Sequence, residues 1–549
     1  MKSRSVCLLL QICLFGMLAP VWFVEPAIGA GQPPEDVKRL TFGDVQVVHF
    51  QRVSGNINRE IRLVGPKTVV TVPEKSSRST LVFHADTILF RKEKQDVSDF
   101  IDMRGNLRYT VTQKDPDGTE RVLEGTAVAG TYRRVEQKIE LRGDVDARLT
   151  DPARLRRPAT LRAERIAVQI GVTPFQYQLT GNSNSEVRFA PRTEASGTPR
   201  VEEVRLARFR EGVFQPGRQA AFSGPETRIE IDQSDGRARF EAERITLAFE
   251  SDDRTVARAT GEGRVQARVE RSRGTGAPET VEGQCERAVF LAREAQVLLK
   301  GRVDLTLLSA EALQGPGRLL AEQVAFMTGR PYHYTVSGSP ERSRLVFTPR
   351  SPVSPGSDAS PRSRFAFGTI TIESFERGEF VPGEKALFTG TGLFFRSEAP
   401  DAGSAARVRC QQVVARFLNE EVVSTAELTG GVTFDVQRVD PLSGRPQAAR
   451  GKAERATFRN TAQAREVQLT GPLEVEIIDE VALAAPGVIR DPGASSLTLD
   501  LSQDLLTFDI ESAQATGEIR FQPRDAETGT SAPVSPSRKA APNRGNPRR

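Results

Sequence analysis

The stretch that decides the fold is Lys138-Ile139-Glu140-Leu141-Arg142-Gly143-Asp144-Val145-Asp146-Ala147-Arg148-Leu149. Apolar or small residues occupy every odd-numbered position, and charged residues occupy every even-numbered one. Successive side chains of a β-strand point to opposite faces, so this period of two predicts one buried face and one solvated face. A helix would spread the same charges around its whole circumference. The stretch therefore predicts a β-strand with a glycine near its centre.

The pattern of an alternating approach, a glycine and an alternating exit returns along the whole chain. Its glycines are Gly65, Gly105, Gly143, Gly181, Gly224, Gly261, Gly301, Gly338, Gly390, Gly430, Gly471 and Gly517. This series predicts about twelve repeats of about 40 residues each. A glycine inside a strand usually marks a bulge, a bend or a close approach of two backbones. We therefore interpret these glycines as architectural.

A second motif precedes many of these glycines by roughly 20 residues. It reads Ala-Glu-Arg between apolar neighbours, as in 163–165, 242–244 and 453–455. Ala, Glu and Arg are good helix formers, but the alternation and the β-branched neighbours favour a strand. Each repeat then supplies two or more short strands that bury their apolar face by stacking on the next repeat. We expect an all-β chain built as an elongated, solenoid-like stack.

The amino-terminal residues 1–30 differ in composition from the repeats. They combine Lys2 and Arg4, an apolar run and small residues up to Ala30, which is the pattern of a secretory signal peptide. An uncleaved membrane anchor is the alternative, because the apolar run could just span a bilayer. We therefore expect an exported protein that is either soluble or tethered to the inner membrane.

Two further segments interrupt or follow the repeats. We predict one region of repeats at 31–347 and a second at 365–523, joined by a Pro- and Ser-rich linker at 348–364. Residues 524–549 form a Pro-, Ser-, Arg- and Ala-rich basic tail that we expect to be disordered. The five basic residues of 535–549 equal the net charge of +5 of the whole chain, so the repeats are close to neutral. This balance argues against a nucleic-acid-binding surface.

The sequence lacks the residue patterns of a catalytic or metal site. His49, His84 and His333 lie in three different repeats, and no His-Glu-x-x-His, Gly-x-Ser-x-Gly, phosphate-binding loop or Cys-x-x-Cys occurs. We predict that the protein is not an enzyme and holds no cofactor and no metal. A weaker alternative is a polysaccharide-processing enzyme with an acid pair on its β-scaffold. We interpret Cys285 and Cys410 as buried small hydrophobes, with a disulfide between them as the alternative.

The repeated strand pairs resemble the OstA-like superfamily, which includes the periplasmic lipopolysaccharide-transport components LptA and LptC and the N-terminal domain of LptD. The best matches are at 161–181, 281–303 and 449–471, and the resemblance extends over about residues 40–523. It implies an open β-jellyroll that holds acyl chains in its apolar interior and joins its partners end to end. The chain departs from the family in being several times as long as one family domain.

The resemblance also implies a function and a set of partners. It suggests a periplasmic bridge that carries lipopolysaccharide, or a related amphiphile, towards the outer membrane. Other Lpt-type envelope proteins, or a second copy of the chain, would dock on its end strands. The inward-facing residues expected to line the lipid are Ile139, Leu141, Val145, Val297, Leu299, Val303, Val467 and Leu469. A structural or adhesive β-solenoid with a filled core has the same inward-facing pattern, so both interpretations stay open.

Overall fold

A computed structural model describes the chain at residues 38–92, 99–115, 117–192, 201–234, 236–250, 255–271, 279–308, 313–328, 333–348, 368–381, 384–399, 403–417, 423–439, 444–460, 465–480, 482–500, 508–512 and 517–524. The elements of these residues are 31 β-strands, which confirms the prediction of an elongated all-β fold. The signal peptide at 1–30 lies outside the described residues, as do all but the first residue of the predicted linker and of the predicted tail.

The first strand and the ten that follow it cover the amino-terminal third. They are β1 (Arg39–Phe42), β2 (Val45–Val48), β3 (Arg52–Asn56), β4 (Glu60–Glu74), β5 (Ser79–Arg91), β6 (Phe100–Lys114), β7 (Glu120–Arg133), β8 (Lys138–Thr150), β9 (Leu155–Gln169), β10 (Gln176–Thr180) and β11 (Glu186–Pro191). The middle strands are β12 (Val201–Ala207), β13 (Glu211–Gln215), β14 (Gln219–Gln233), β15 (Gly236–Phe249), β16 (Val256–Arg271), β17 (Glu279–Leu291), β18 (Gln296–Leu308), β19 (Gly317–Met327), β20 (Tyr334–Ser337) and β21 (Arg344–Phe347). The last are β22 (Thr369–Glu373), β23 (Arg377–Val381), β24 (Lys385–Ala399), β25 (Ser404–Phe417), β26 (Val423–Val439), β27 (Pro446–Asn460), β28 (Arg465–Asp479), β29 (Leu483–Asp500), β30 (Phe508–Ser512) and β31 (Glu518–Pro523).

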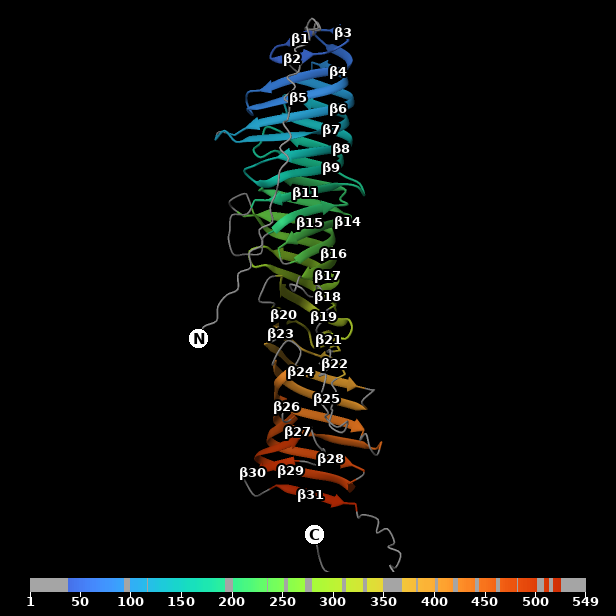
Figure 1. The fold of residues 1–549 in the computed structure, drawn as a ribbon, viewed down its shortest axis with the longest axis vertical. Coiled ribbons are helices and arrows are strands. Elements are labelled where there is room, and N and C mark those ends of the chain that lie inside the picture. The colour runs from blue at the N-terminus through green and yellow to red at the C-terminus, as the bar shows by residue number, and fades with distance from the viewer. Residues whose placement is uncertain are drawn as a thin grey trace, which may run out of the picture.

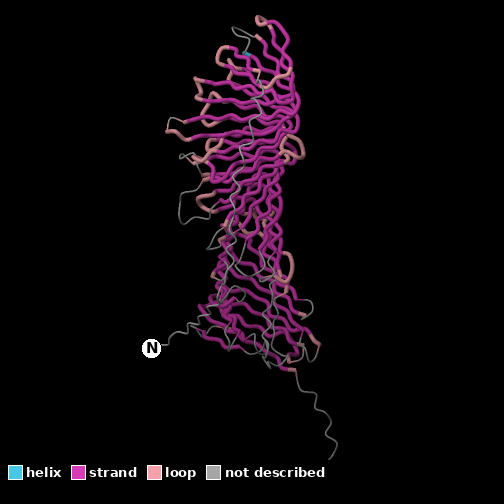
Figure 2. The backbone as a smooth tube through the Cα atoms, turned by 45° about the horizontal axis from the view of Figure 1, so that its top comes forward, coloured by secondary structure: helices cyan, strands magenta, loops and turns pink. Residues whose placement is uncertain are grey.

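These strands form one long antiparallel stack. Figure 1 shows them running across the long axis, with β1 at one end of the molecule and β31 at the other. The tube in Figure 2 shows that strands make up almost all of the described chain. The Ala-Glu-Arg segments lie within β9, β15 and β27, so they are strands as predicted and not helices.

Each long strand bends near its middle and contributes to two half-sheets. In β6, for example, the register with β7 shifts between Arg104 and Leu107. Half-sheet 1 contains segments such as 100–104 of β6 and 129–133 of β7, and half-sheet 2 contains 107–114 of β6 and 120–127 of β7. Side chains from the two half-sheets meet in the interior, where the rings of Phe83 and Tyr132 are 6.2 Å apart. The apolar face of each strand is therefore buried against its own other half and its neighbours.

The bend depends on the glycine of the opening stretch and its counterparts. Gly143 has φ +78° and Asp144 has φ +43°, so two successive residues adopt the left-handed conformation that favours glycine. A Cβ atom at Gly143 would lie 2.8 Å from the Cβ of Val128 on β7. The equivalent bulge glycines Gly263 and Gly301 also have positive φ. These glycines therefore place the corner between the half-sheets.

The second sequence motif supplies the residue that covers this corner. Glu243 of β15 packs over Gly263, Glu286 of β17 over Gly301, and Glu454 of β27 over Gly471. At Gly263 and Gly301 the following arginine pairs with the same glutamate, as Arg302 Nε does with Glu286 Oε1 at 2.8 Å. The two motifs that recur along the sequence are thus partners on adjacent strands.

The strand pairing repeats over a longer segment than 40 residues. β9 pairs with β10 in half-sheet 1 and with β11 in half-sheet 2, and β14 pairs with β13 and β12 in the same way. The arrangement recurs at β19–β24, and β29 ends the described chain by pairing with β30 and β31. We therefore define three units of equivalent topology: the first from β2 to β11, the second from β12 to β21 and the third from β22 to β31.

This topology bears on two sequence predictions. The structure does not confirm the count of about twelve repeats, since the pairing pattern recurs in the three longer units. Within β16, the left-handed glycine is Gly263 rather than Gly261. The sheet also continues past the predicted linker, because β21 pairs with β22 and β20 pairs with β23. The predicted regions 31–347 and 365–523 thus share one hydrogen-bonded sheet, and their boundaries stay a prediction.

The corner makes Gly143→Ala a test of the fold. We expect this variant to lower the free energy of unfolding by about 2 kcal/mol, because alanine in a left-handed conformation costs about 1–2 kcal/mol and its Cβ would crowd Val128. The measurement is the thermal unfolding midpoint followed by circular dichroism. Gly392→Ala is the matched control, since Gly392 lies in β24 with nothing within 4 Å of an added Cβ. Equal midpoints for the two variants would contradict the role of Gly143.

Candidate functional site

The eight residues predicted to line a lipid lie on three strands that occupy the same place in the three units. Ile139, Leu141 and Val145 belong to β8, Val297, Leu299 and Val303 to β18, and Val467 and Leu469 to β28. All of them except Val467 are at most 2% exposed. Val467 is partly buried. At β8 and β18 these side chains therefore pack in a filled interior, and their contact with a lipid stays a prediction.

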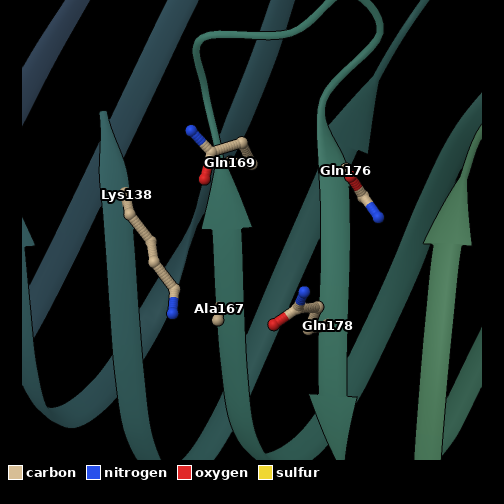
Figure 3. Close-up of a pocket in the computed structure, with 5 residues that line it drawn as sticks. All are labelled: Lys138, Ala167, Gln169, Gln176 and Gln178. Atoms are coloured by element: carbon tan, nitrogen blue, oxygen red, sulfur yellow. The ribbon is translucent and has the colours of Figure 1, made fainter. Parts of the chain in front are cut away.

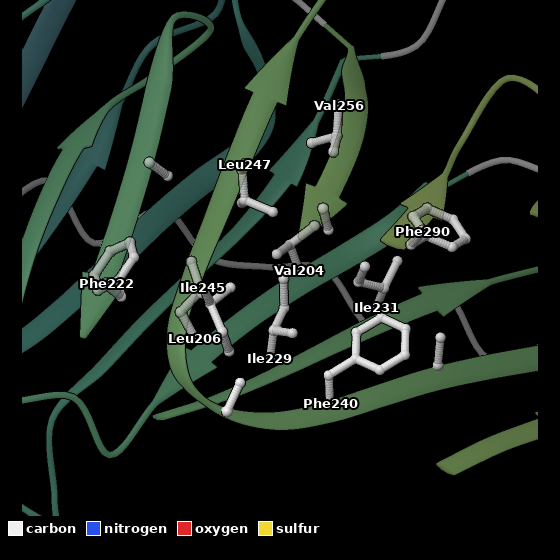
Figure 4. Packing of buried hydrophobic residues seen from close by; sticks show 14 of the residues in the cluster. Val204, Leu206, Phe222, Ile229, Ile231, Phe240, Ile245, Leu247, Val256 and Phe290 are labelled. Carbon is white, nitrogen blue, oxygen red and sulfur yellow. The ribbon is translucent and has the colours of Figure 1, made fainter. Parts of the chain in front are cut away.

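The interior of the first and second units is filled by large side chains. Tyr109, Phe83 and Phe90 in the first unit are fully buried, as are Phe222 and Phe240 in the second. Figure 4 shows Val204, Leu206, Ile229, Ile231, Phe240, Ile245 and Leu247 converging from neighbouring strands. Burying each such side chain stabilises the fold by about 1.5–3 kcal/mol. This part of the interior is a packed core.

The interior of the third unit differs, because many of its apolar residues are only partly buried. Those on half-sheet 1 are Phe380, Val413, Ala415, Phe417, Leu428 and Val467. Those on half-sheet 2 are Phe395, Val408 and Phe434. We call the rows from β23 to β28 the apolar groove. Its side chains are those an apolar ligand would contact.

Some inward side chains of β25 are smaller than their counterparts in the other units. Three inward positions of β5 carry Phe83, Ile88 and Phe90. The bulge registers align these positions with Val408, Val413 and Ala415 on β25. The same positions of β15 carry Phe240, Ile245 and Leu247. Replacing phenylalanine by valine and alanine removes side-chain volume at these two positions. The third unit therefore keeps the backbone arrangement and loses part of the filling.

Polar contacts close the edge opposite the corner in the first unit. Arg134, at the end of β7 in half-sheet 1, reaches Asp44 at 2.8 Å and Glu74 at 2.7 Å in half-sheet 2. Gln137 donates to Ser76 Oγ at 2.5 Å, and Gln113 donates to the carbonyl oxygen of Ile170 at 3.4 Å. These bonds join the two half-sheets across the edge.

One buried arginine closes the same edge in the second unit. Arg271 of β16 donates to the hydroxyl of Tyr334 on β20 at 2.5 Å. Its guanidinium carbon lies 4.7 Å from the centroid of the Tyr334 ring and 5.4 Å from that of Phe326. Phe380 continues this aromatic cluster into the third unit, 5.8 Å from Tyr334 between ring centroids. The cluster marks the point where the packed core ends and the apolar groove begins.

A shallow depression on the outer face of the first unit has different chemistry. Lys138, Ala167, Gln169, Gln176 and Gln178 line it (Figure 3), from β8, β9 and β10. These residues belong to the solvated faces of their strands, and the depression does not reach the interior. It offers polar contacts and no enclosed volume for an acyl chain.

Two cysteines and one histidine of the described chain have shifted pKa values. Cys285 and Cys410 are free and buried, and burial raises the pKa of each thiol to about 11. The structure thus has no bridge between them. Burial, with Arg108 and His49 nearby, lowers the pKa of His84. Within the described ranges, no group of three or more His, Cys, Asp or Glu side chains is placed to hold a metal ion.

The described segments contain no helix with the length and hydrophobicity needed to cross a membrane. Comparisons with known proteins add no assignment: no family model matches the chain, and no curated protein matches it significantly. The functional argument therefore depends on the geometry of the interior.

The edge residues and the triple arrangement were not found from the sequence. A signal for the three units exists in the segments SEVRFAPR at 185–192, SRLVFTPR at 343–350 and GEIRFQPR at 517–524. In the described parts of these segments, the phenylalanine lies on β11, β21 and β31. Arg134 and Arg121 carry no comparable signal, because arginine is common along the whole chain.

The Arg134 contacts predict an acid-dependent loss of stability in the first unit. The hydrogen bond from Arg134 holds the pKa of Asp44 below its ordinary value of 3.8. The bond therefore contributes stability above about pH 4 and loses it as the pH falls through the lowered pKa of Asp44. We expect Arg134→Gln to lower the free energy of unfolding by about 1–3 kcal/mol at pH 7 and to reduce the slope of stability between pH 5 and pH 3.

The measurement is the thermal unfolding midpoint at several pH values. Arg133→Gln is the control, because Arg133 precedes Arg134 and pairs with Glu136, three residues away, at 3.3 Å. A pH slope that Arg134→Gln leaves unchanged would show that the bond to Asp44 contributes nothing to the closed edge.

Proposed function

We propose that the protein binds an amphiphile, lipopolysaccharide or a related lipid, with its acyl chains in the apolar groove of the third unit. The observation that carries this proposal is the partial exposure of facing apolar rows between β23 and β28. An acyl chain there would gain about 0.8 kcal/mol for each methylene that it buries. The described residues supply no chemistry for cleaving such a ligand, so binding and transport fit better than catalysis.

In this proposal the first and second units have a different role from the third. The first and second units are packed through, so they would act as a rod that holds the third unit at a distance. About two dozen layers of strands, spaced by about 4.8 Å between hydrogen-bonded neighbours, give a length on the order of 110 Å. A molecule of that length could bridge much of a periplasm. The proposed location is the periplasm, in agreement with the signal-peptide pattern of residues 1–30.

The two ends of the stack support docking of partner proteins by strand addition. β3 occupies the place of β13 and β23, which pair with β10 and β20. β30, at the other end, occupies the place of β10 and β20. Val53 near one end is 48% exposed and Ile519 near the other is 55% exposed. A Lpt-type envelope protein or a second copy of the chain could continue the sheet at either end.

A structural or adhesive rod is the second candidate function. The filled interior of the first and second units favours it, since a purely mechanical element needs no opening. The two candidates differ in what the third unit contacts in the cell envelope.

Site-specific photocrosslinking in the envelope separates the candidates. A benzoylphenylalanine at Phe434 would lie among the partly buried residues of the groove, and we expect it to form crosslinks with lipopolysaccharide detected by immunoblotting. The same probe at Asp435 points outward and is the matched control. The same probe at Leu141 tests the packed core, where we expect no crosslink. Equal labelling at 434 and 435, or none at 434, would favour the structural rod.

Filling the groove gives an independent test. Val408→Phe with Ala415→Phe restores the residues that β5 carries at the same inward positions. We expect the double variant to fold, with a thermal midpoint at or above that of the unchanged protein, and to lose lipopolysaccharide binding by at least about tenfold, or about 1.4 kcal/mol. Binding would be measured by retention of labelled lipid on the immobilised protein. Unchanged binding by a folded variant would place the lipid elsewhere.

A further inference from the structure

A polar triad lies at the edge of half-sheet 2 opposite the corner in the first unit. Gln113 on β6, Arg121 on β7 and Asp151 after β8 all point inward from the ends of neighbouring strands. Arg121 is the middle member: it donates to Gln113 Oε1 at 3.0 Å and pairs through Nε with Asp151 Oδ2 at 3.0 Å. It also pairs with Asp115, and its side chain is 1% exposed. This arginine is neutralised and shielded, as a structural ion pair inside a closed edge must be.

The third unit carries the same three residue types at the same places, with two of them exchanged. Arg438 on β26 takes the place of Gln113, Gln447 on β27 takes that of Arg121, and Asp479 on β28 takes that of Asp151. Arg438 Nε donates to Gln447 Oε1 at 2.6 Å, and Gln447 Nε2 donates to Asp479 Oδ2 at 2.7 Å. The glutamine now lies between the arginine and the aspartate.

The exchange moves the positive charge towards the solvent and the groove. Gln447 and Asp479 remain buried, whereas Arg438 is only partly buried. By the alternation of β26, Arg438 continues the inward row of Phe434 and Val436 to the edge of the sheet. The guanidinium group therefore stands where the apolar groove meets water, which is where an amphiphile bound in that groove would place its head group.

Two more arginines gather at the same edge. Arg445, in the turn before β27, and Arg524, after β31, both donate to the carbonyl oxygen of Glu480, at 3.4 Å and 2.7 Å. Glu480 directly follows Asp479, so Arg445 and Arg524 lie beside the turn that follows the triad. Arginine side chains suit phosphate and carboxylate groups, because their planar donors match two oxygens at once.

We propose that Arg438, with Arg445 and Arg524, forms an anion site that binds the phosphate or carboxylate head group of the amphiphile held in the apolar groove. This inference rests on the proposed function of the groove and adds selectivity to it: ligands with an anionic head group bind more tightly than uncharged ligands with the same acyl chain. The equivalent position in the first unit carries Gln113, and Arg121 beside it is enclosed.

The test compares two ligands that differ only in the phosphate, 1-palmitoyl lysophosphatidic acid and 1-monopalmitoylglycerol. Binding to the full-length protein would be measured by calorimetry below the micellar concentrations and at low salt. We expect the phosphate ligand to bind about tenfold more tightly, as one charge-assisted hydrogen bond supplies. Arg438→Gln should remove this preference while leaving the affinity for monopalmitoylglycerol unchanged, and Arg438→Lys should keep part of it.

Controls make each outcome decisive. Arg450→Gln is the matched variant, because Arg450 lies on the outer face of β27 and pairs with Glu476 at 3.7 Å; it should keep the full preference. Equal binding of both ligands by the unchanged protein would overturn the anion site and leave the groove. Binding of neither would overturn both proposals. Inorganic phosphate alone, if it bound as tightly as the lysophosphatidic acid, would assign the site to free anions instead of head groups.

Discussion

A left-handed glycine at the middle of many long even-numbered strands is the constraint on which the rest of the structure depends. Gly105, Gly143, Gly263, Gly301 and Gly430 share a positive φ and a neighbour-strand side chain packed against them. A strand of 13 to 17 residues that stayed straight would leave its apolar face with nothing to pack against. The bend folds the sheet over on itself, so that one chain supplies both layers of its interior. Glu243 and Glu286 then cover the corner from the adjacent strands and complete it.

Because the corner and the backbone ladder hold the stack together, the filling of the interior can vary without a change of fold. β5 and β25 have the same pairing and the same bulge, yet one carries Phe83 and Phe90 inward where the other carries Val408 and Ala415. Two such substitutions forfeit apolar burial worth several kcal/mol. In a stack of this length, the neighbouring rungs still supply the backbone hydrogen bonds on both sides. The same backbone arrangement can therefore hold a packed core in one unit and an apolar groove in another.

The parts of this structure that follow from local pattern were predictable, and those that depend on distant partners were not. The inward direction of Ile139, Leu141 and Val145 follows from the alternation, and so does the strand at Ala163-Glu164-Arg165. The three units were missed because β10 with β11, and β12 with β13, replace one bent strand by two short ones joined by a loop. The glycine series alone does not distinguish two short strands of this kind from one bent strand. The sequence also did not reveal that Gln447 takes the place of Arg121, since no local pattern aligns β27 with β7.

The sequence by itself determined the all-β class, the face of each strand that is dry, and the corner, because all three depend on periodicity and on the few conformations that glycine alone adopts easily. Only the tertiary structure decided where the interior is filled and where it opens. That outcome depends on the summed volume of side chains that meet from both half-sheets, and residues such as Phe83 and Tyr132 are far apart in the chain. The tertiary structure also decided that Arg121 is enclosed by carboxylates while Arg438 stands at the edge. The environment of a charge is set by the strands packed around it, and the same residue type can be fully buried in one unit and partly buried at the edge in another.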